Sequence, residues 1–170
     1  MNQNSQNGVA WTLIKLLLFT VLVPGSVVIY VPWYFLSRGI GLPGFEIGAL
    51  KYLGALPMAA GAFFYLRSAL DFALRGKGTP APIDAPRFLV TSNLYRAVRN
   101  PMYVGVVMAL GGEALYFESF AILRYAAAVW LAFHLFVLLY EEPTLRKNFG
   151  ASYEEYCRQV PRWLPRFPRS

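Results

Sequence analysis

Cysteine, histidine and charged side chains are scarce in this chain of 170 residues. The single cysteine is Cys157, the single histidine is His134, and charged residues make up 15% of the sequence. A lone cysteine cannot form a disulfide within the chain, and we interpret it as a reduced thiol in a tail that faces the cytoplasm. The sequence has no grouping of metal-ligand residues, so we predict no metal site. It also lacks a glycine-rich nucleotide loop and a hydrolase triad.

Apolar residues, by contrast, make up 56% of the sequence, more than one small soluble core can bury. They gather in four stretches, at residues 9–36, 47–74, 101–115 and 119–140. A hydrocarbon layer of about 30 Å takes roughly 20 helical residues to cross, and the third stretch is shorter than that. We therefore predict an all-α fold, a polytopic membrane helical bundle of about four transmembrane helices. Because few residues separate the last two stretches, we expect an antiparallel hairpin in which Ser119 caps the fourth helix.

Basic residues are distributed unevenly between the connections. The connection from Arg75 to Arg99 holds five bases against one acid, and the tail after Tyr140 holds six more. The turn around Arg38 and the turn at residues 111–118 have almost none. Since cytoplasmic loops carry the excess of Lys and Arg, both termini and the second connection are predicted to be cytoplasmic. The net charge of +7 then reflects orientation and contact with anionic membrane lipids, and we expect no nucleic acid as a partner.

The basic tail is predicted to form a short amphipathic helical unit. Pro143 suits the first turn of a new helix, and Gly150 suits its C-terminal end. Ser152 and Glu155 have the spacing of a capping box for a second short helix. Three residues that we expect to pack against the membrane domain follow at helical spacing: Tyr153, Tyr156 and Val160.

A charged junction marks the start of the third apolar stretch. Asn100 suits the N-cap position and Pro101 the first helical residue. The free amides just inside this helix, at Met102 and Tyr103, together with Arg99, would also suit a carboxylate or phosphate group. The pattern therefore predicts either a simple helix cap or an anion site.

A second charged junction lies at Glu141, where the fourth apolar stretch ends. A carboxylate at the C-terminal end of a helix is unfavourable unless a cation accompanies it. Either Arg99 or a cationic group of a ligand could be that cation. A ligand that carries both a carboxylate and cationic groups would fit both junctions, and S-adenosylmethionine is one such molecule.

Several spaced motifs fall in register across the second half of the chain. They are Leu89-Val90-Thr91-Ser92, Tyr95, Arg99-Asn100-Pro101-Met102-Tyr103-Val104-Gly105, Glu141-Glu142, Phe149 to Tyr156, and Val160-Pro161-Arg162. Together they resemble the catalytic half of the isoprenylcysteine carboxyl methyltransferase and phospholipid methyltransferase family. The resemblance implies one integral membrane domain over residues 1–170, with its catalytic, cofactor-binding half at 76–165. It further implies that these residues line an S-adenosylmethionine pocket: Arg87, Phe88, Leu89, Val90, Tyr95, Asn100, Pro101, Met102, Tyr103 and Glu141.

Two positions depart from the family pattern. Asn100 replaces the usual histidine; it can hydrogen-bond but cannot titrate, so we expect it to bind the cofactor rather than transfer a proton. Eukaryotic prenylcysteine enzymes of the family place an arginine, implicated in handling the substrate carboxyl, about one turn before the first glutamate of the pair. Here that residue is Val137. We assign Val137 to the substrate site and expect a neutral or amine-bearing lipophilic acceptor.

Candidates for direct roles in the chemistry are few. Arg99 is one, and His134 is another because it lies two helical turns before Glu141 on the same face. His134 could also be an ordinary packing residue. Four aromatic residues could surround a sulfonium by cation-π contact or serve as packing and interface anchors: Tyr103, Trp130, Phe133 and Tyr140.

The sequence thus predicts a membrane methyltransferase that uses S-adenosylmethionine and transfers a methyl group to a lipophilic small molecule or lipid. We expect the cofactor site on the cytoplasmic side. Two alternatives stay open. Sterol reductases have a similar C-terminal helical region, so a membrane reductase with a nicotinamide cofactor is one. A noncatalytic membrane scaffold is the other.

Overall fold

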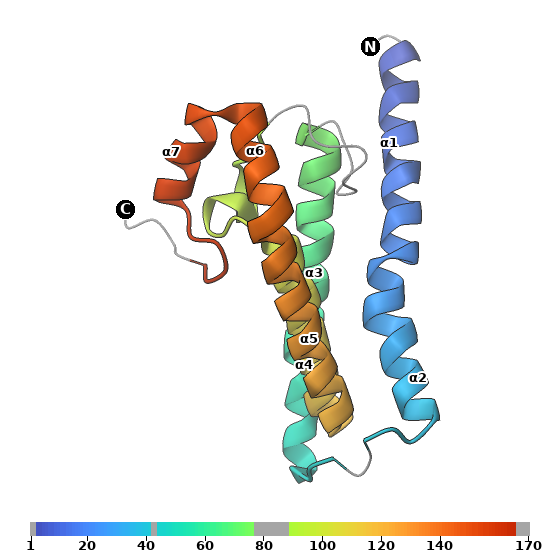
Figure 1. The fold of residues 1–170 in the computed structure, drawn as a ribbon. Coiled ribbons are helices and arrows are strands. Elements are labelled where there is room, and N and C mark those ends of the chain that lie inside the picture. The colour runs from blue at the N-terminus through green and yellow to red at the C-terminus, as the bar shows by residue number, and fades with distance from the viewer. Residues whose placement is uncertain (1–2, 42–43, 77–88, 166–170) are drawn as a thin grey trace.

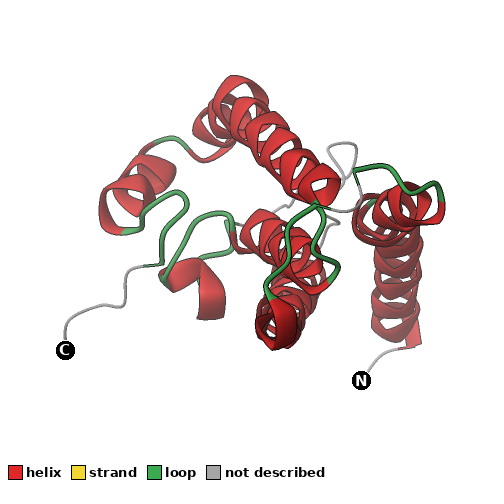
Figure 2. Ribbon diagram, turned by 90° about the horizontal axis from the view of Figure 1, so that it is seen from below, coloured by secondary structure: helices red, strands yellow, loops and turns green. Residues whose placement is uncertain are grey.

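The computed structural model describes residues 3–41, 44–76 and 89–165. Every regular element in these ranges is helical, which confirms the predicted all-α fold (Figures 1 and 2). The long elements are, in chain order, α1 (Gln3–Leu22), α2 (Val31–Ser37), α3 (Ala55–Asp71), α4 (Pro101–Tyr116), α5 (Phe120–Phe136), α6 (Glu142–Phe149) and α7 (Ala151–Gln159). Short 3-10 and π turns join or extend them: η1 (Ser26–Tyr30), η2 (Gly48–Gly54), η3 (Phe72–Gly76), η5 (Asn93–Arg96) and η6 (Val137–Glu141).

Within the described ranges, three helical segments are long and apolar enough to cross a membrane. They are Trp11–Ser37, Gly48–Leu74 and Phe120–Phe149. The remaining apolar stretch, the third in chain order, forms α4, which has 16 residues and is therefore about 24 Å long. The expectation of about four membrane helices is compatible with three full-length segments and this shorter one, and the chain is an integral membrane protein.

Glycines allow α3 and α4 to pack with their backbones almost touching. A Cβ atom added at Gly61 would lie 2.4 Å from the carbonyl oxygen of Gly105, and one added at Gly105 would lie 2.7 Å from the oxygen of Gly61. Seven residues away along each helix, Gly54 and Gly112 make the same reciprocal approach. Small residues are the usual means by which membrane helices approach closely, because lipid offers no hydrophobic driving force for association. The α3–α4 pair is thus the rigid centre of the bundle.

The turn between α4 and α5 has the predicted hairpin geometry. Ser119 is fully buried, and its hydroxyl accepts a hydrogen bond from the Ile122 amide at 3.3 Å, which confirms it as the N-cap of α5. The neighbouring Glu118 carboxylate accepts from the Ile47 amide at 2.8 Å and from Lys51 Nζ at 3.3 Å. These contacts tie the hairpin to the segment that precedes α3.

The helical column that begins with α5 does not stop at Glu141. The π turn η6 and α6 continue it without a break to Phe149, and Pro143 lies in the first turn of α6 rather than at the start of a separate helix. Gly150, with φ of +50°, ends α6 and precedes α7, as predicted. The predicted capping box is wrong, because α7 begins at Ala151 and Glu155 instead binds Arg158 and Gln159.

The tail folds back onto the segment before α4. Tyr153, Tyr156 and Val160 are buried together as expected, and Leu89 packs against them. The Tyr156 hydroxyl donates to the carbonyl oxygen of Tyr95 at 2.7 Å. The docking surface is therefore the 89–100 segment, which also carries the first predicted junction.

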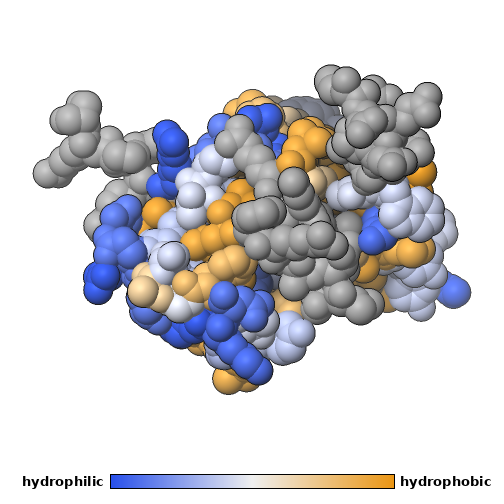
Figure 3. Space-filling model, turned by 90° about the horizontal axis from the view of Figure 1, so that it is seen from above, coloured by the Kyte–Doolittle hydropathy of each residue, from blue (hydrophilic) through white to orange (hydrophobic). Residues whose placement is uncertain are grey.

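The described parts of the two predicted base-rich regions lie at one end of the molecule. The start of α1, the end of α3, the start of α4 and helix α7 share this end, while the turns after α2 and α4 lie at the other (Figure 1). Seen from the α7 end, hydrophilic residues gather on the side of the C-terminal tail (Figure 3). This grouping of the connections agrees with the predicted alternation of the helices across the membrane.

Candidate functional site

The first carboxylate of the Glu141-Glu142 pair meets two tyrosines. Tyr103, on α4, donates a hydrogen bond to Glu141 Oε2 at 2.9 Å. Tyr95, on η5, is 6% exposed. Burial raises the pKa of the Tyr95 hydroxyl well above its ordinary value, and the nearby charge of Glu141 raises it further, so this hydroxyl is neutral at physiological pH. Among the described residues Glu141 has no salt-bridge partner, which leaves its remaining lone pairs free.

The second carboxylate, Glu142, is held in a dense ion-pair network. Its side chain is 3% exposed and lies 3.1 Å from Arg99 Nη1. Arg162 approaches it from the tail through Nε at 2.6 Å and Nη2 at 3.0 Å, and Arg146 lies 3.6 Å away. The arginine proposed as the partner of Glu141 therefore pairs with Glu142 instead. The reason is geometric, since consecutive residues of a helix point in directions about 100° apart.

Arg99 makes further contacts that bind the tail. Its Nη1 donates to Cys157 Sγ at 2.7 Å, and its backbone amide donates to the carbonyl oxygen of Pro161 at 2.9 Å. The side chain is only 10% exposed. These contacts give Arg99 a structural function in joining the start of α4 to the tail.

The start of α4 has the predicted proline but lacks the predicted side-chain cap. Pro101 occupies the first helical turn, whereas the Asn100 side chain makes no capping hydrogen bond. Its Nδ2 donates instead to the carbonyl oxygen of Arg162 at 3.1 Å, so a tail carbonyl has displaced the local cap. The amides of Met102 and Tyr103 donate to no described residue. They remain available to an anionic group.

Aromatic rings surround His134 and Tyr103. The Trp163 indole donates to His134 Nδ1 at 3.0 Å, and the Trp130 ring stacks on His134 at 5.3 Å. Tyr103 lies 4.6 Å from the Phe133 ring and 6.5 Å from the Trp163 ring, centroid to centroid. Because Nδ1 accepts a hydrogen bond, the proton of the neutral imidazole lies on Nε2, which makes His134 a donor rather than a base toward a ligand.

Trp163 was missed by the sequence reasoning, and Tyr140 does not join this cluster. The signal for Trp163 was its place directly after the motif that ends at Arg162. Tyr140 is 48% exposed and packs on Phe136. Another missed residue is Asp71, which is 3% exposed, accepts two hydrogen bonds from Asn93 and contributes to the raised pKa of Tyr95.

The remaining predicted site residues are Arg87, Phe88, Leu89, Val90 and Val137. Arg87 and Phe88 lie outside the described residues. Leu89 packs against the tail, and Val90 is 7% exposed. Val137 is 1% exposed and lies one turn before Glu141. Within the described ranges no group of three or more histidine, cysteine, aspartate or glutamate side chains could hold a metal ion.

Comparison with known proteins confirms the resemblance. The phospholipid methyltransferase family matches residues 50–152. Protein-S-isoprenylcysteine O-methyltransferase of Schizosaccharomyces pombe is 37% identical over 81 residues, which are 47% of this chain and 34% of that protein. The corresponding B enzyme of Arabidopsis thaliana is 32% identical over 45% of this chain and 39% of its own length.

A third relative differs in its acceptor. Methanethiol S-methyltransferase 2 of Bradyrhizobium diazoefficiens is 32% identical over 45% of this chain and 28% of its own length. The matched stretch thus spans well under half the length of each relative. Because the family match covers more than half of its residues, this chain belongs to the phospholipid methyltransferase family.

Proposed function

We propose that this protein transfers a methyl group from S-adenosylmethionine to a lipophilic acceptor within the membrane. The observation that carries the proposal is the contrast between Glu141 and Glu142. Ion pairs neutralise Glu142, whereas Glu141 receives one hydrogen bond from Tyr103 and keeps acceptor capacity for a ligand. The hydrogen bond from Tyr103 joins it to the first turn of α4. Family membership and the named activities of three relatives support the same conclusion.

The polar groups present fit the two ends of the cofactor. We expect Glu141 to accept hydrogen bonds from its cationic amino group or its hydroxyls, and the Met102 and Tyr103 amides to receive its carboxylate. Rings of Tyr103, Phe133 and Trp163 would contact a positive centre by cation-π attraction and exclude water. When bound, S-adenosylmethionine supplies an electrophilic methyl group on a sulfonium. The task of the protein is to align this methyl with the nucleophile.

The acceptor is proposed to be a lipophilic molecule without a carboxylate at its reacting end. Val137 is fully apolar and 1% exposed where the prenylcysteine enzymes are expected to present an arginine. A bidentate arginine is a specific means of holding a carboxylate, and valine offers no hydrogen bond in its place. An amine- or thiol-bearing lipophile fits this position better, and one relative is named for a thiol substrate.

The cofactor site is proposed to face the cytoplasm. The start of α4, helix α7 and the start of α1 lie at one end of the bundle, and the described parts of the base-rich regions belong to this end (Figure 1). The positive-inside rule then places the site on the cytoplasmic side.

Two experiments on detergent-purified protein test the proposal. Calorimetry with S-adenosylmethionine and with NADPH should show binding of the first and not of the second. Binding of NADPH alone would favour the reductase, and binding of neither would favour a scaffold.

A radiolabelled methyl-transfer assay then compares farnesylcysteine, phosphatidylethanolamine and small lipophilic thiols. Efficient turnover of farnesylcysteine would overturn the acceptor class argued from Val137.

A further inference from the structure

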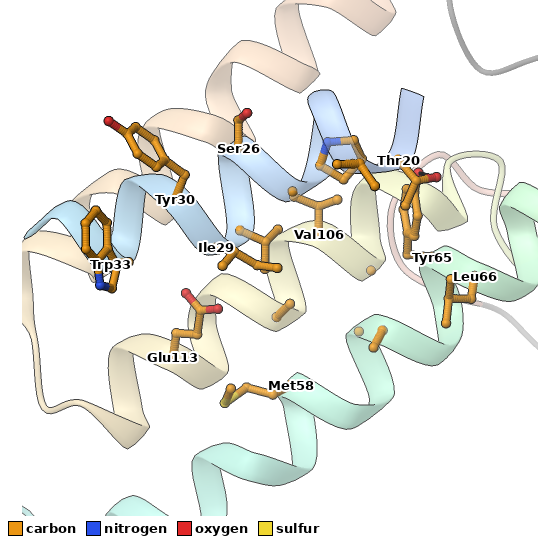
Figure 4. Close-up of a pocket in the computed structure, with 18 residues that line it drawn as sticks. Thr20, Ser26, Ile29, Tyr30, Trp33, Met58, Tyr65, Leu66, Val106 and Glu113 are labelled. Carbon is orange, nitrogen blue, oxygen red and sulfur yellow. Dashed lines mark hydrogen bonds between the residues drawn. The ribbon is translucent and has the colours of Figure 1, made fainter. Parts of the chain in front are cut away.

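A cavity of about 740 Å³ lies between the first helical column, which consists of α1, η1 and α2, and the α3–α4 pair (Figure 4). Its volume is within the range of small-molecule sites in proteins. Most of its lining is apolar, with Ile29, Met58, Val106 and Ala109 among the contributing residues. The rim is exposed on the side of the first column, where Ile29 has 70% of its surface accessible. An apolar molecule could enter here from the bilayer.

One carboxylate in this lining lacks a partner. Glu113, on α4, is 8% exposed, and its Oε2 atom is buried without a hydrogen bond. It makes no ion pair with any residue that the structure describes. Its carboxyl group points from α4 toward the side of the cavity where Ile29 and Trp33 lie (Figure 4). A buried carboxylate without a partner is unfavourable, so its presence at membrane depth marks a functional position.

Three other polar side chains of the lining have hydrogen-bond partners within the protein. The Thr20 and Tyr65 hydroxyls are hydrogen-bonded to each other at 2.8 Å, and the Ser26 hydroxyl donates to the carbonyl oxygen of Leu22 at 2.6 Å. Neither arrangement reaches Glu113. The cavity therefore presents one carboxyl group with an oxygen that lacks a hydrogen-bond partner, in mostly apolar surroundings.

The cavity is distinct from the candidate methyl-transfer site. Tyr103 points from α4 toward Phe133 and Glu141, whereas Gly105 and Glu113 face α3 and the first column. Glu113 also lies ten residues beyond Tyr103, about 15 Å along the helix axis. The two sites thus use different faces of α4, and Glu113 lies toward the opposite end of the helix from Tyr103.

We propose that this cavity binds an apolar ligand with a single protonated amine, its ammonium group placed against Glu113 and its chain along the apolar lining. An ammonium group both neutralises the carboxylate and donates the missing hydrogen bond. A neutral alcohol would supply only the hydrogen bond, and a fatty acid would place two carboxylates together. The proposal does not depend on the methyl-transfer activity, because it concerns other residues.

The test is equilibrium binding of radiolabelled dodecylamine to the full-length protein in nonionic detergent, with dodecanol as the neutral probe of equal chain length. The unmodified protein should bind dodecylamine at least about tenfold more tightly than dodecanol. Glu113→Gln keeps the shape of the side chain and removes its charge, so this preference should vanish. Glu46→Gln is the matched control, because Glu46 is an exposed carboxylate outside the cavity, and it should keep the preference.

A second variant fills the cavity instead of removing the charge. Ala62 lies in the lining, and Ala62→Phe should weaken the binding of both probes. Thermal unfolding in detergent, measured on the same samples, reports whether each variant is folded. Equal affinity of the unmodified protein for the amine and the alcohol would overturn the proposal, and so would a preference that survives in Glu113→Gln. Unchanged binding of both probes to Ala62→Phe would show that they bind elsewhere.

Discussion

The adjacent glutamates provide a sharp test of the candidate site, because the same substitution should act differently at each. Glu141→Gln should weaken S-adenosylmethionine binding and leave the folded state nearly as stable as before. Glu142→Gln should act mainly on stability. The difference arises because Glu141 has one hydrogen-bond donor among the described residues, while Glu142 has three arginines within 3.6 Å.

The magnitudes follow from these contacts. A hydrogen bond to a charged group contributes about 1.5–3 kcal/mol, so its loss at Glu141 should weaken cofactor binding by about tenfold to a hundredfold. Removal of one partner from a buried ion pair typically costs about 3–5 kcal/mol, because the opposite charge is left without compensation. Glu142→Gln should reach that range, since it leaves Arg99 and Arg162 unpaired between α4 and the tail.

Two measurements on the same preparations separate the outcomes. Calorimetric titration with S-adenosylmethionine gives the affinity, and thermal unfolding in detergent gives the Tm. We expect a large change in affinity with a small change in Tm for Glu141→Gln, and a clearly lowered Tm for Glu142→Gln. Normal cofactor affinity of Glu141→Gln would refute the assignment of this carboxylate. An unchanged Tm of Glu142→Gln would refute the role of the ion-pair network.

Three further predictions concern packing, the substrate position and orientation. Gly105→Ala should destabilise the fold by about 1–3 kcal/mol, measured by denaturant or thermal unfolding, because the added methyl group meets the α3 backbone. Gly111→Ala is the control and should be neutral or stabilising, because nothing lies within 4 Å of the added methyl group. Val137→Arg should lower the Tm by an amount that corresponds to about 3 kcal/mol or more, because it places an unpaired charge at a side-chain position that is only 1% exposed. An unaltered Tm would show that a partner or solvent reaches this position. The orientation is tested with single-cysteine variants in which the native cysteine is replaced by serine. In right-side-out vesicles, a membrane-impermeant maleimide should label Glu46→Cys and should not label Arg158→Cys. The reverse labelling pattern would overturn the proposed orientation.

Local patterns in the sequence were sufficient for much of the fold. Runs of apolar residues predicted the helical columns, because the length needed to cross a bilayer depends only on the helical rise and the hydrocarbon thickness. Ser119 was identified as a cap and Gly150 as a helix end, since each depends on backbone groups within a few residues. The tyrosines at helical spacing in the tail likewise indicated the face that docks.

Contacts between distant segments decided what local patterns could not. Asn100 caps no helix because a carbonyl at Arg162 is within reach, and Glu141 and Glu142 acquire different partners because successive helical residues point about 100° apart. Glu113 looked like part of a turn in the sequence, yet it is buried in α4 beside a cavity. Each outcome depends on which side chains a helix meets across the bundle. Periodicity shows which residues share a face, but only the tertiary packing determines what that face contacts.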